Sequence, residues 1–143
     1  MDNIYQKAIE VATAMSVATP DNGVVLYSIS FLPTKENKEQ AFAYLEQHPD
    51  AMMIDQTECG QALIKMGLLN NHPDLSSEQI AHVWKIASKR MIEQARGDIK
   101  AFVKNADSRS VFRSTELPTI LQNPYIYTIN GIDKFTFANS YFG

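Results

Sequence analysis

The groups in this chain that could do chemistry are aromatic side chains and carboxylates at the ends of predicted elements. Tyr27 closes the apolar half of the first predicted strand, and Glu46 lies at the end of a predicted helix. Trp84, the only tryptophan, precedes Ser88 by four residues, so the two share one helical face. Glu116 lies in a polar stretch that follows a strand. Aromatic faces attract cationic groups, and a carboxylate stabilises nearby positive charge.

Several common kinds of site are excluded by the residues present. The three histidines, His48, His72 and His82, do not fall at a ligand-like spacing from the lone Cys59, so we expect no metal. The sequence contains neither a Walker loop nor a GxGxxG segment, so it has neither of the common glycine-rich loops that bind nucleotide phosphates. It also lacks the nucleophile elbow of serine hydrolases.

The elements that must position these side chains follow from hydrophobic periodicity and turn residues. Helices are predicted over about residues 3–18, 35–47, 59–66 and 77–96, the last with a Ser76–Gln79 capping-box pattern. Strands are predicted over 24–31, 98–103, 125–129 and 135–138, with a tight turn at Asn130-Gly131. We therefore expect an α/β fold in which a helical N-terminal half packs on a small, largely parallel sheet in the C-terminal half.

Length, charge and cysteine content limit the domain organisation and the classes of function that fit the chain. The 143 residues predict one domain, with a helical lobe at about 1–97, including one early strand, and a sheet lobe at about 98–143. A net charge of −3 disfavours a nucleic-acid binder. A single cysteine allows no internal disulfide. No apolar run or signal-peptide pattern is present, so we expect no membrane contact and action in a cytoplasm.

Four separated motifs together resemble the ADP-ribosyl cyclase/NAD glycohydrolase family. The segment from His82 to Ala95 is similar to the W-x-x-x-S helix of that family, and Ser110 to Glu116 is similar to its S-x-F-x-S-x-E loop. Upstream, Leu26-Tyr27-Ser28 resembles L-W-S, and Tyr44-Leu45-Glu46 resembles T-L-E. The motifs occur in the family order across about residues 25–130.

The resemblance implies a role for each matching residue. Glu116 corresponds to the catalytic carboxylate, and Glu46 to an acidic residue that binds the nicotinamide carboxamide and favours hydrolysis over cyclisation. Trp84 corresponds to an aromatic that stacks on nicotinamide, Tyr27 replaces a second such aromatic, and Ser88 corresponds to a residue that contacts the phosphates of NAD. The fold implied is that of the ADP-ribosyl cyclases.

The Glu116 loop supplies two further expected contacts, and one family residue is missing. Phe112 is the phenylalanine of the loop motif and is expected to contact substrate. The family often places arginine directly after L-W-S, whereas this chain has Ile29. We therefore expect Arg113 to bind phosphate instead.

The implied reaction agrees with the chemistry of these groups. Nicotinamide in NAD is a cationic ring, which aromatic faces hold by stacking and cation–π attraction. Its departure leaves an oxocarbenium-like ribose, which a carboxylate stabilises or traps. We expect release of nicotinamide with ADP-ribose or cyclic ADP-ribose, with NAD as a substrate and no cofactor.

Other readings of the same residues stay open. Taken singly, Trp84 and Tyr27 fit a hydrophobic core, and Glu46 and Glu116 fit a solvated surface. Two other classes of function are a non-catalytic nucleotide-binding or interaction module and a small nuclease toxin. The absence of disulfides favours a bacterial NAD-depleting toxin domain that acts in the cytoplasm of a target cell and is blocked by a cognate immunity protein.

Overall fold

The computed structural model describes residues 3–28, 36–69, 71–104 and 112–142. Its helices are α1 (Ile4–Ala14), α2 (Glu36–Gln47), η1 (Ile54–Gln56), α3 (Glu58–Lys65), α4 (Ser77–Gln94), η2 (Phe112–Glu116), α5 (Leu117–Gln122) and α6 (Lys134–Phe142). Its strands are β1 (Val24–Tyr27), β2 (Gly97–Phe102), β3 (Ile126–Ile129) and β4 (Ile132–Asp133).

The four strands form one mostly parallel sheet in the order β1-β2-β3-β4. The first three strands run parallel, and β4 returns antiparallel beside β3 through a tight turn. That turn is the expected Asn130-Gly131, where both residues take positive φ values of 54° and 77°. The predicted α/β fold, with N-terminal helices and a small, largely parallel sheet, is therefore confirmed.

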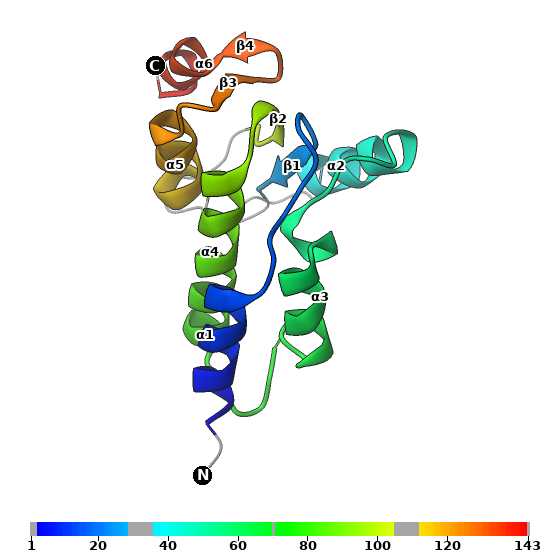
Figure 1. Ribbon diagram of the computed structural model, residues 1–143, viewed down its shortest axis with the longest axis vertical. Helices are drawn as coiled ribbons and strands as arrows, with labels where there is room; N and C mark the ends of the chain where they lie inside the picture. Colours follow the sequence, from blue (N-terminus) through cyan, green and yellow to red (C-terminus); the bar gives the residue numbers. More distant parts are fainter. Residues whose placement is uncertain (1–2, 29–35, 70, 105–111, 143) are drawn as a thin grey trace.

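Alternating side chains of β1 point to opposite faces of the sheet and join two cores. Val24 and Leu26 contribute to the main core, whereas Val25 joins a smaller cluster with Ala41 of α2 and Met53. In Figure 1, α1, α3 and α4 lie together at one end, and α2 lies beside β1. The edge of the sheet formed by β1 is thus covered on both faces.

Helix α4 is fixed at both ends by side chains. The expected capping box is present, because the Ser76 hydroxyl accepts from the Gln79 N–H while the Gln79 side chain accepts from the Ser76 N–H. At the other end, the Asn123 amide donates to the carbonyls of Ile92 and Ala95. These bonds fix the helix that carries Trp84 and Ser88.

A buried amide also fixes the carboxyl ends of the two strands nearest the candidate site residues. The Asn37 side chain donates to the carbonyls of Ser28 (2.8 Å) and Lys104 (3.0 Å), and it accepts from the Lys104 N–H. Asn37 is only 3% exposed, so this link has little access to water. The end of β1 and the segment after β2 therefore keep a fixed distance from each other.

The predicted strand at 135–138 is wrong, because this segment belongs to α6. The Asp133 carboxylate accepts from the N–H groups of Phe135 and Thr136, which caps the helix start. Lys134 and Ala138, four residues apart, are both buried on the inner side of that helix. The aromatic and β-branched composition that suggested a strand was overridden by this cap and by packing.

Other boundaries differ by a few residues. The first helix ends at Ala14 rather than 18, since Met15 is already extended, and α4 ends at Gln94 rather than 96. The polar stretch around Glu116 was not predicted to be helical. It forms one π-helical turn, η2, that runs into α5, with Pro118 in the first turn of α5. Residues 29–31 of the predicted first strand lie outside the described residues.

Candidate active site

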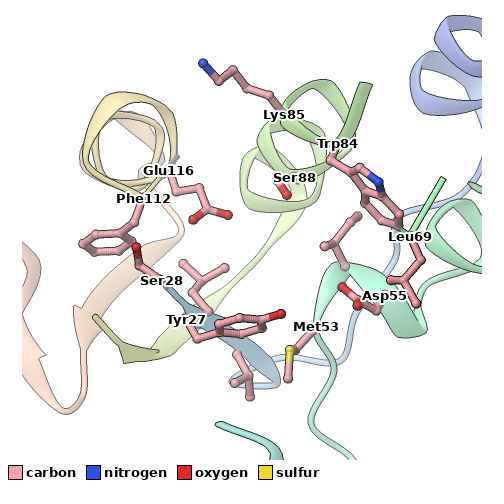
Figure 2. Close-up of a pocket in the computed structure, with 13 residues that line it drawn as sticks. Tyr27, Ser28, Met53, Asp55, Leu69, Trp84, Lys85, Ser88, Phe112 and Glu116 are labelled. Atoms are coloured by element: carbon pink, nitrogen blue, oxygen red, sulfur yellow. The ribbon is translucent and has the colours of Figure 1, made fainter. Parts of the chain in front are cut away.

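A pocket with a volume of about 260 Å³ opens beside the carboxyl end of β1. In open α/β sheets, ligands bind at the carboxyl ends of parallel strands, because the loops that follow those strands meet there. The walls come from the ends of β1 and η1, from α4 and from η2 (Figure 2). Its polar lining residues are Ser28, Asp55, Lys85, Ser88 and Glu116.

The aromatic lining comes from three elements. Tyr27 closes β1, Trp84 lies on α4, and Phe112 begins η2. Phe112 is buried, whereas Tyr27 and Trp84 are half-buried and keep part of their rings open to the pocket. The Trp84 indole N–H donates to the Leu68 carbonyl at 2.8 Å, which fixes the plane of the ring. The pocket therefore presents aromatic surface held in place by the fold.

Glu116 is the buried carboxylate of this pocket. It is 6% exposed, and burial raises its pKa from 4.5 to about 7 because the charged form loses contact with water. A hydrogen bond donated by the Ser88 hydroxyl acts in the opposite direction and lowers that pKa. Figure 2 shows the carboxylate and this hydroxyl facing the same space. A carboxyl group with a pKa near neutrality is suited to acid–base or charge-stabilising chemistry.

Sequence reasoning missed the second acidic side chain of the pocket. Asp55 lies in η1, is half-buried, and has a pKa raised by burial. Burial also raises the pKa of Tyr27, and the charges of Asp55 and Glu116 raise it further, so the Tyr27 hydroxyl lies near both carboxylates. Asp55 directly follows the apolar run 51–54, and Met52 of that run pairs with Val24 of β1. This apolar run was the sequence feature that could have indicated a buried position for Asp55.

The structure places Glu46, the other acidic residue expected at the site, away from the pocket. Glu46 is exposed in the last turn of α2 and does not line the pocket. Met52 pairs with Val24 of β1. This pairing places η1, and not the end of α2, beside the carboxyl end of β1. Asp55 is therefore the acidic side chain that faces Glu116 across the pocket (Figure 2).

The other predicted site residues divide into two groups. Tyr27, Trp84, Ser88, Phe112 and Glu116 all line the pocket, although they are spread over 90 positions of the chain. Arg113, the expected phosphate ligand, is half-buried in η2 and does not line it. Ser28 was seen only as part of a motif, and its buried hydroxyl has no hydrogen-bond partner among the described residues. That hydroxyl is available to a ligand.

Two further properties concern the described part of the chain only. Across residues 3–28, 36–69, 71–104 and 112–142, no three His, Cys, Asp or Glu side chains gather closely enough to hold a metal ion. Within the same ranges, no helix has the length and apolar character needed to cross a membrane.

The fold and the pocket define an α/β protein with a part-aromatic, part-acidic site at the carboxyl ends of parallel strands. Porcine CD38, complexed with a covalent intermediate, ribo-F-ribose-5′-phosphate, is similar to it with a TM-score of 0.57 and 17% identity, over 88% of this chain and 67% of that chain. A glutamate-to-alanine mutant of ADP-ribosyl cyclase gives a TM-score of 0.55 and 13% identity, over 88% and 62%. The chain thus has the fold of the ADP-ribosyl cyclases, which confirms the fold implied by the four motifs.

The similarity is one of structure rather than of sequence. No protein-family model and no curated protein sequence matches the chain. At 17% and 13% identity, the two solved structures establish the fold alone. The chemistry of the pocket therefore depends on the residues that line it.

Proposed function

We propose that this chain is a single-domain NAD glycohydrolase that cleaves the bond between nicotinamide and ribose in NAD. The observation that carries the proposal is the Glu116 carboxylate, which is buried, hydrogen-bonded by Ser88 and set in a pocket with aromatic walls. A carboxylate in a low-dielectric site interacts strongly with positive charge that develops beside it. The fold shared with ADP-ribosyl cyclase and CD38 supports the same chemistry.

Three residues of the pocket bind the nicotinamide group of the substrate. The half-buried faces of Trp84 and Tyr27 stack on the cationic nicotinamide ring and attract it by cation–π interaction, worth about 0.5–2 kcal/mol. Asp55, rather than Glu46, accepts a hydrogen bond from the carboxamide and adds a negative charge close to the ring. Together these contacts hold the leaving group and orient the ribose toward Glu116.

Bond cleavage then proceeds without a cofactor. The C1′–N bond breaks, its electron pair goes to the ring nitrogen, and neutral nicotinamide leaves. The Glu116 carboxylate stabilises the positive charge that remains on the ribose. Water adds to C1′ and releases a proton to give ADP-ribose, whereas attack by adenine N1 gives cyclic ADP-ribose. The access of water to the pocket sets the ratio of the two products.

Direct product analysis tests this function. The purified protein is incubated with NAD, and nicotinamide, ADP-ribose and cyclic ADP-ribose are resolved by chromatography. NADH serves as the matched control, because its reduced ring is uncharged and is a poor leaving group. We expect nicotinamide release from NAD only. Folded protein that releases none would leave a non-catalytic nucleotide-binding module as the better account.

We also propose a biological setting for this activity, a bacterial toxin domain that depletes NAD in the cytoplasm of a target cell. The only cysteine, Cys59, is buried and free, so the fold does not depend on an oxidising compartment. A cognate immunity protein would cover the pocket in the producing cell. Expression in a bacterium without such a protein should lower cellular NAD and stop growth, and normal growth with unchanged NAD would contradict the toxin role.

A further inference from the structure

The Glu116 carboxylate lies on a π-turn rather than on an α-helix. Residues Phe112–Glu116 form this turn, η2, and Glu116 keeps helical dihedral angles of φ −70° and ψ −48° where η2 continues into α5. The two elements therefore form one helix with a wide first turn. A π-turn bonds each N–H to the carbonyl five residues before it, and such turns are rare and recur at functional sites.

Pro118 supplies a local cause for the π-turn. It lies in the first turn of α5, a place that suits proline when no N–H is needed there. Here the preceding residues are already helical, so an α-helical course would press the proline ring against the Ser114 carbonyl, four residues earlier, and leave that carbonyl without its donor. The wider π-turn avoids this clash. The Thr119 hydroxyl donates to the Thr115 carbonyl at 2.7 Å and supports the junction.

The π-turn also decides which side chains of this helix face inward. Phe112 and Leu117 are both buried in the main core, at 1% and 0% exposure, although they are five residues apart. In an α-helix, side chains five residues apart point about 140° away from each other, so the two could not share one face. The i→i+5 bonding of the π-turn brings them to the same side. Glu116, directly before Leu117, then lines the pocket.

The position of Glu116 in the pocket depends on this turn, whereas the other ionisable groups there do not. Figure 2 shows Phe112 and Glu116 projecting from the same turn, with the Glu116 carboxylate directed toward Ser88 of α4. The hydrogen bond from the Ser88 hydroxyl requires that direction. The remaining ionisable side chains of the pocket come from β1, η1 and α4, and they are Tyr27, Asp55 and Lys85.

We propose that Pro118 is a positioning residue of the active site: because it lacks an N–H, it holds residues 112–116 in the π-turn that directs Glu116 into the pocket. This inference rests on the proposed function, since it concerns the carboxylate that would stabilise the ribose cation. Pro118 does not line the catalytic pocket, so it acts through Glu116. Its loss should therefore lower kcat by misplacing that carboxylate.

The variant Pro118→Ala in the full chain tests this role. Alanine restores the N–H and favours an α-helix, so residues 112–116 should take the α-helical register, in which Glu116 and Phe112 no longer keep their relative positions. We expect kcat for nicotinamide release from NAD to fall at least about tenfold. Pro73→Ala is the matched control, because Pro73 is exposed in the turn before α4 and does not line the pocket. Equal kcat values for the two variants would overturn the inference.

A register variant separates positioning from a merely structural role. Ser114 is exposed, and its deletion from the Pro118→Ala chain brings Phe112 and Leu117 to a spacing of four residues. Side chains four residues apart share one face of an α-helix, so the inward face would be rebuilt without a π-turn. We expect the deletion to restore most of the kcat that Pro118→Ala loses. A loss of kcat that the deletion does not restore would overturn the positioning role.

Titration of the Glu116 carboxyl by NMR gives a readout that needs no cleavage of NAD. In Pro118→Ala, water reaches the displaced carboxyl, so its pKa should fall from about 7 toward 4.5, and deletion of Ser114 should raise it again. This pattern in a protein that leaves NAD intact would support the positioning role and contradict only the proposed function. An unchanged pKa of Glu116 in folded Pro118→Ala would overturn the inference.

Discussion

At the level of single residues, the environment of Glu116 decides the chemistry of the pocket. In water this carboxyl would be fully ionised at neutral pH, whereas burial raises its pKa to about 7. The Ser88 hydroxyl moderates that effect by donating to the ionised form. The ionised carboxylate is the form that stabilises a cation, so activity should depend on pH near neutrality.

The first prediction concerns the pH profile. For wild-type protein, kcat/KM should rise with pH until about pH 7 and then level off, because only the ionised Glu116 is active and this ratio reports the free enzyme. Ser88→Ala removes the hydrogen bond that lowers the pKa, so its profile should shift to higher pH. Initial rates of nicotinamide release across pH 5–9 measure both. An unshifted profile would mean that Ser88 does not act on Glu116.

The second prediction concerns stability. Between about pH 4.5 and 7 the unfolded carboxyl is ionised while the folded one is protonated, so the folded state binds more protons and its stability falls as pH rises. Glu116→Gln removes this cost and should stabilise the protein by roughly 3 kcal/mol at pH 8, with the gain vanishing below about pH 4.5. Urea denaturation at both pH values checks this. An equal gain at both would show that ionisation is not its source.

The third prediction separates the two candidate acids. Asp55 lines the pocket and Glu46 is exposed on α2, so Asp55→Asn should raise KM for NAD roughly tenfold while Glu46→Gln should not. Steady-state kinetics of the two variants, side by side, measures the difference. The opposite pattern would restore the motif-based assignment of Glu46.

At the scale of elements, the sequence predicted what local patterns encode and missed what tertiary contacts decide. The capping box of α4 and the Asn130-Gly131 turn could be predicted from the sequence, because a few neighbouring residues determine each of them. The segment 135–138 was misread, because the cap from Asp133 and the burial of Lys134 outweigh its β-type composition. Helix boundaries and the π-helical turn at Glu116 likewise depend on packing that spacing does not show.

The fourth prediction is at this scale and concerns the end of α4. The buried Asn123 amide donates to the carbonyls of Ile92 and Ala95, and its oxygen accepts from the Tyr125 N–H. Asn123→Ala would leave these buried groups without partners, so the free energy of unfolding should fall by about 2–4 kcal/mol. Chemical denaturation measures the loss. A loss within about 0.5 kcal/mol, typical of surface positions, would contradict this role.

At the scale of the whole molecule, the sheet brings distant residues to one place. Tyr27, Trp84, Ser88, Phe112 and Glu116 were predicted from ordered motifs, and the structure gathers all of them around one pocket. Asp55 was not predicted, because its place in the pocket depends on how residue 52 pairs with β1 in space. Motif order therefore predicted residues that line one pocket, whereas the acidic residue Asp55 was found only from the structure.

Nicotinamide release from NAD by Glu116→Gln, measured beside wild-type protein, tests most sharply whether Glu116 is the catalytic carboxylate. Glu39→Gln, an exposed acid on α2, is the matched control for loss of one negative charge. We expect release by wild type and Glu39→Gln, and at least a roughly hundredfold loss in folded Glu116→Gln, since the carboxylate stabilises the developing cation. Release by Glu116→Gln within a few-fold of wild type would contradict the assignment of Glu116 as the catalytic carboxylate.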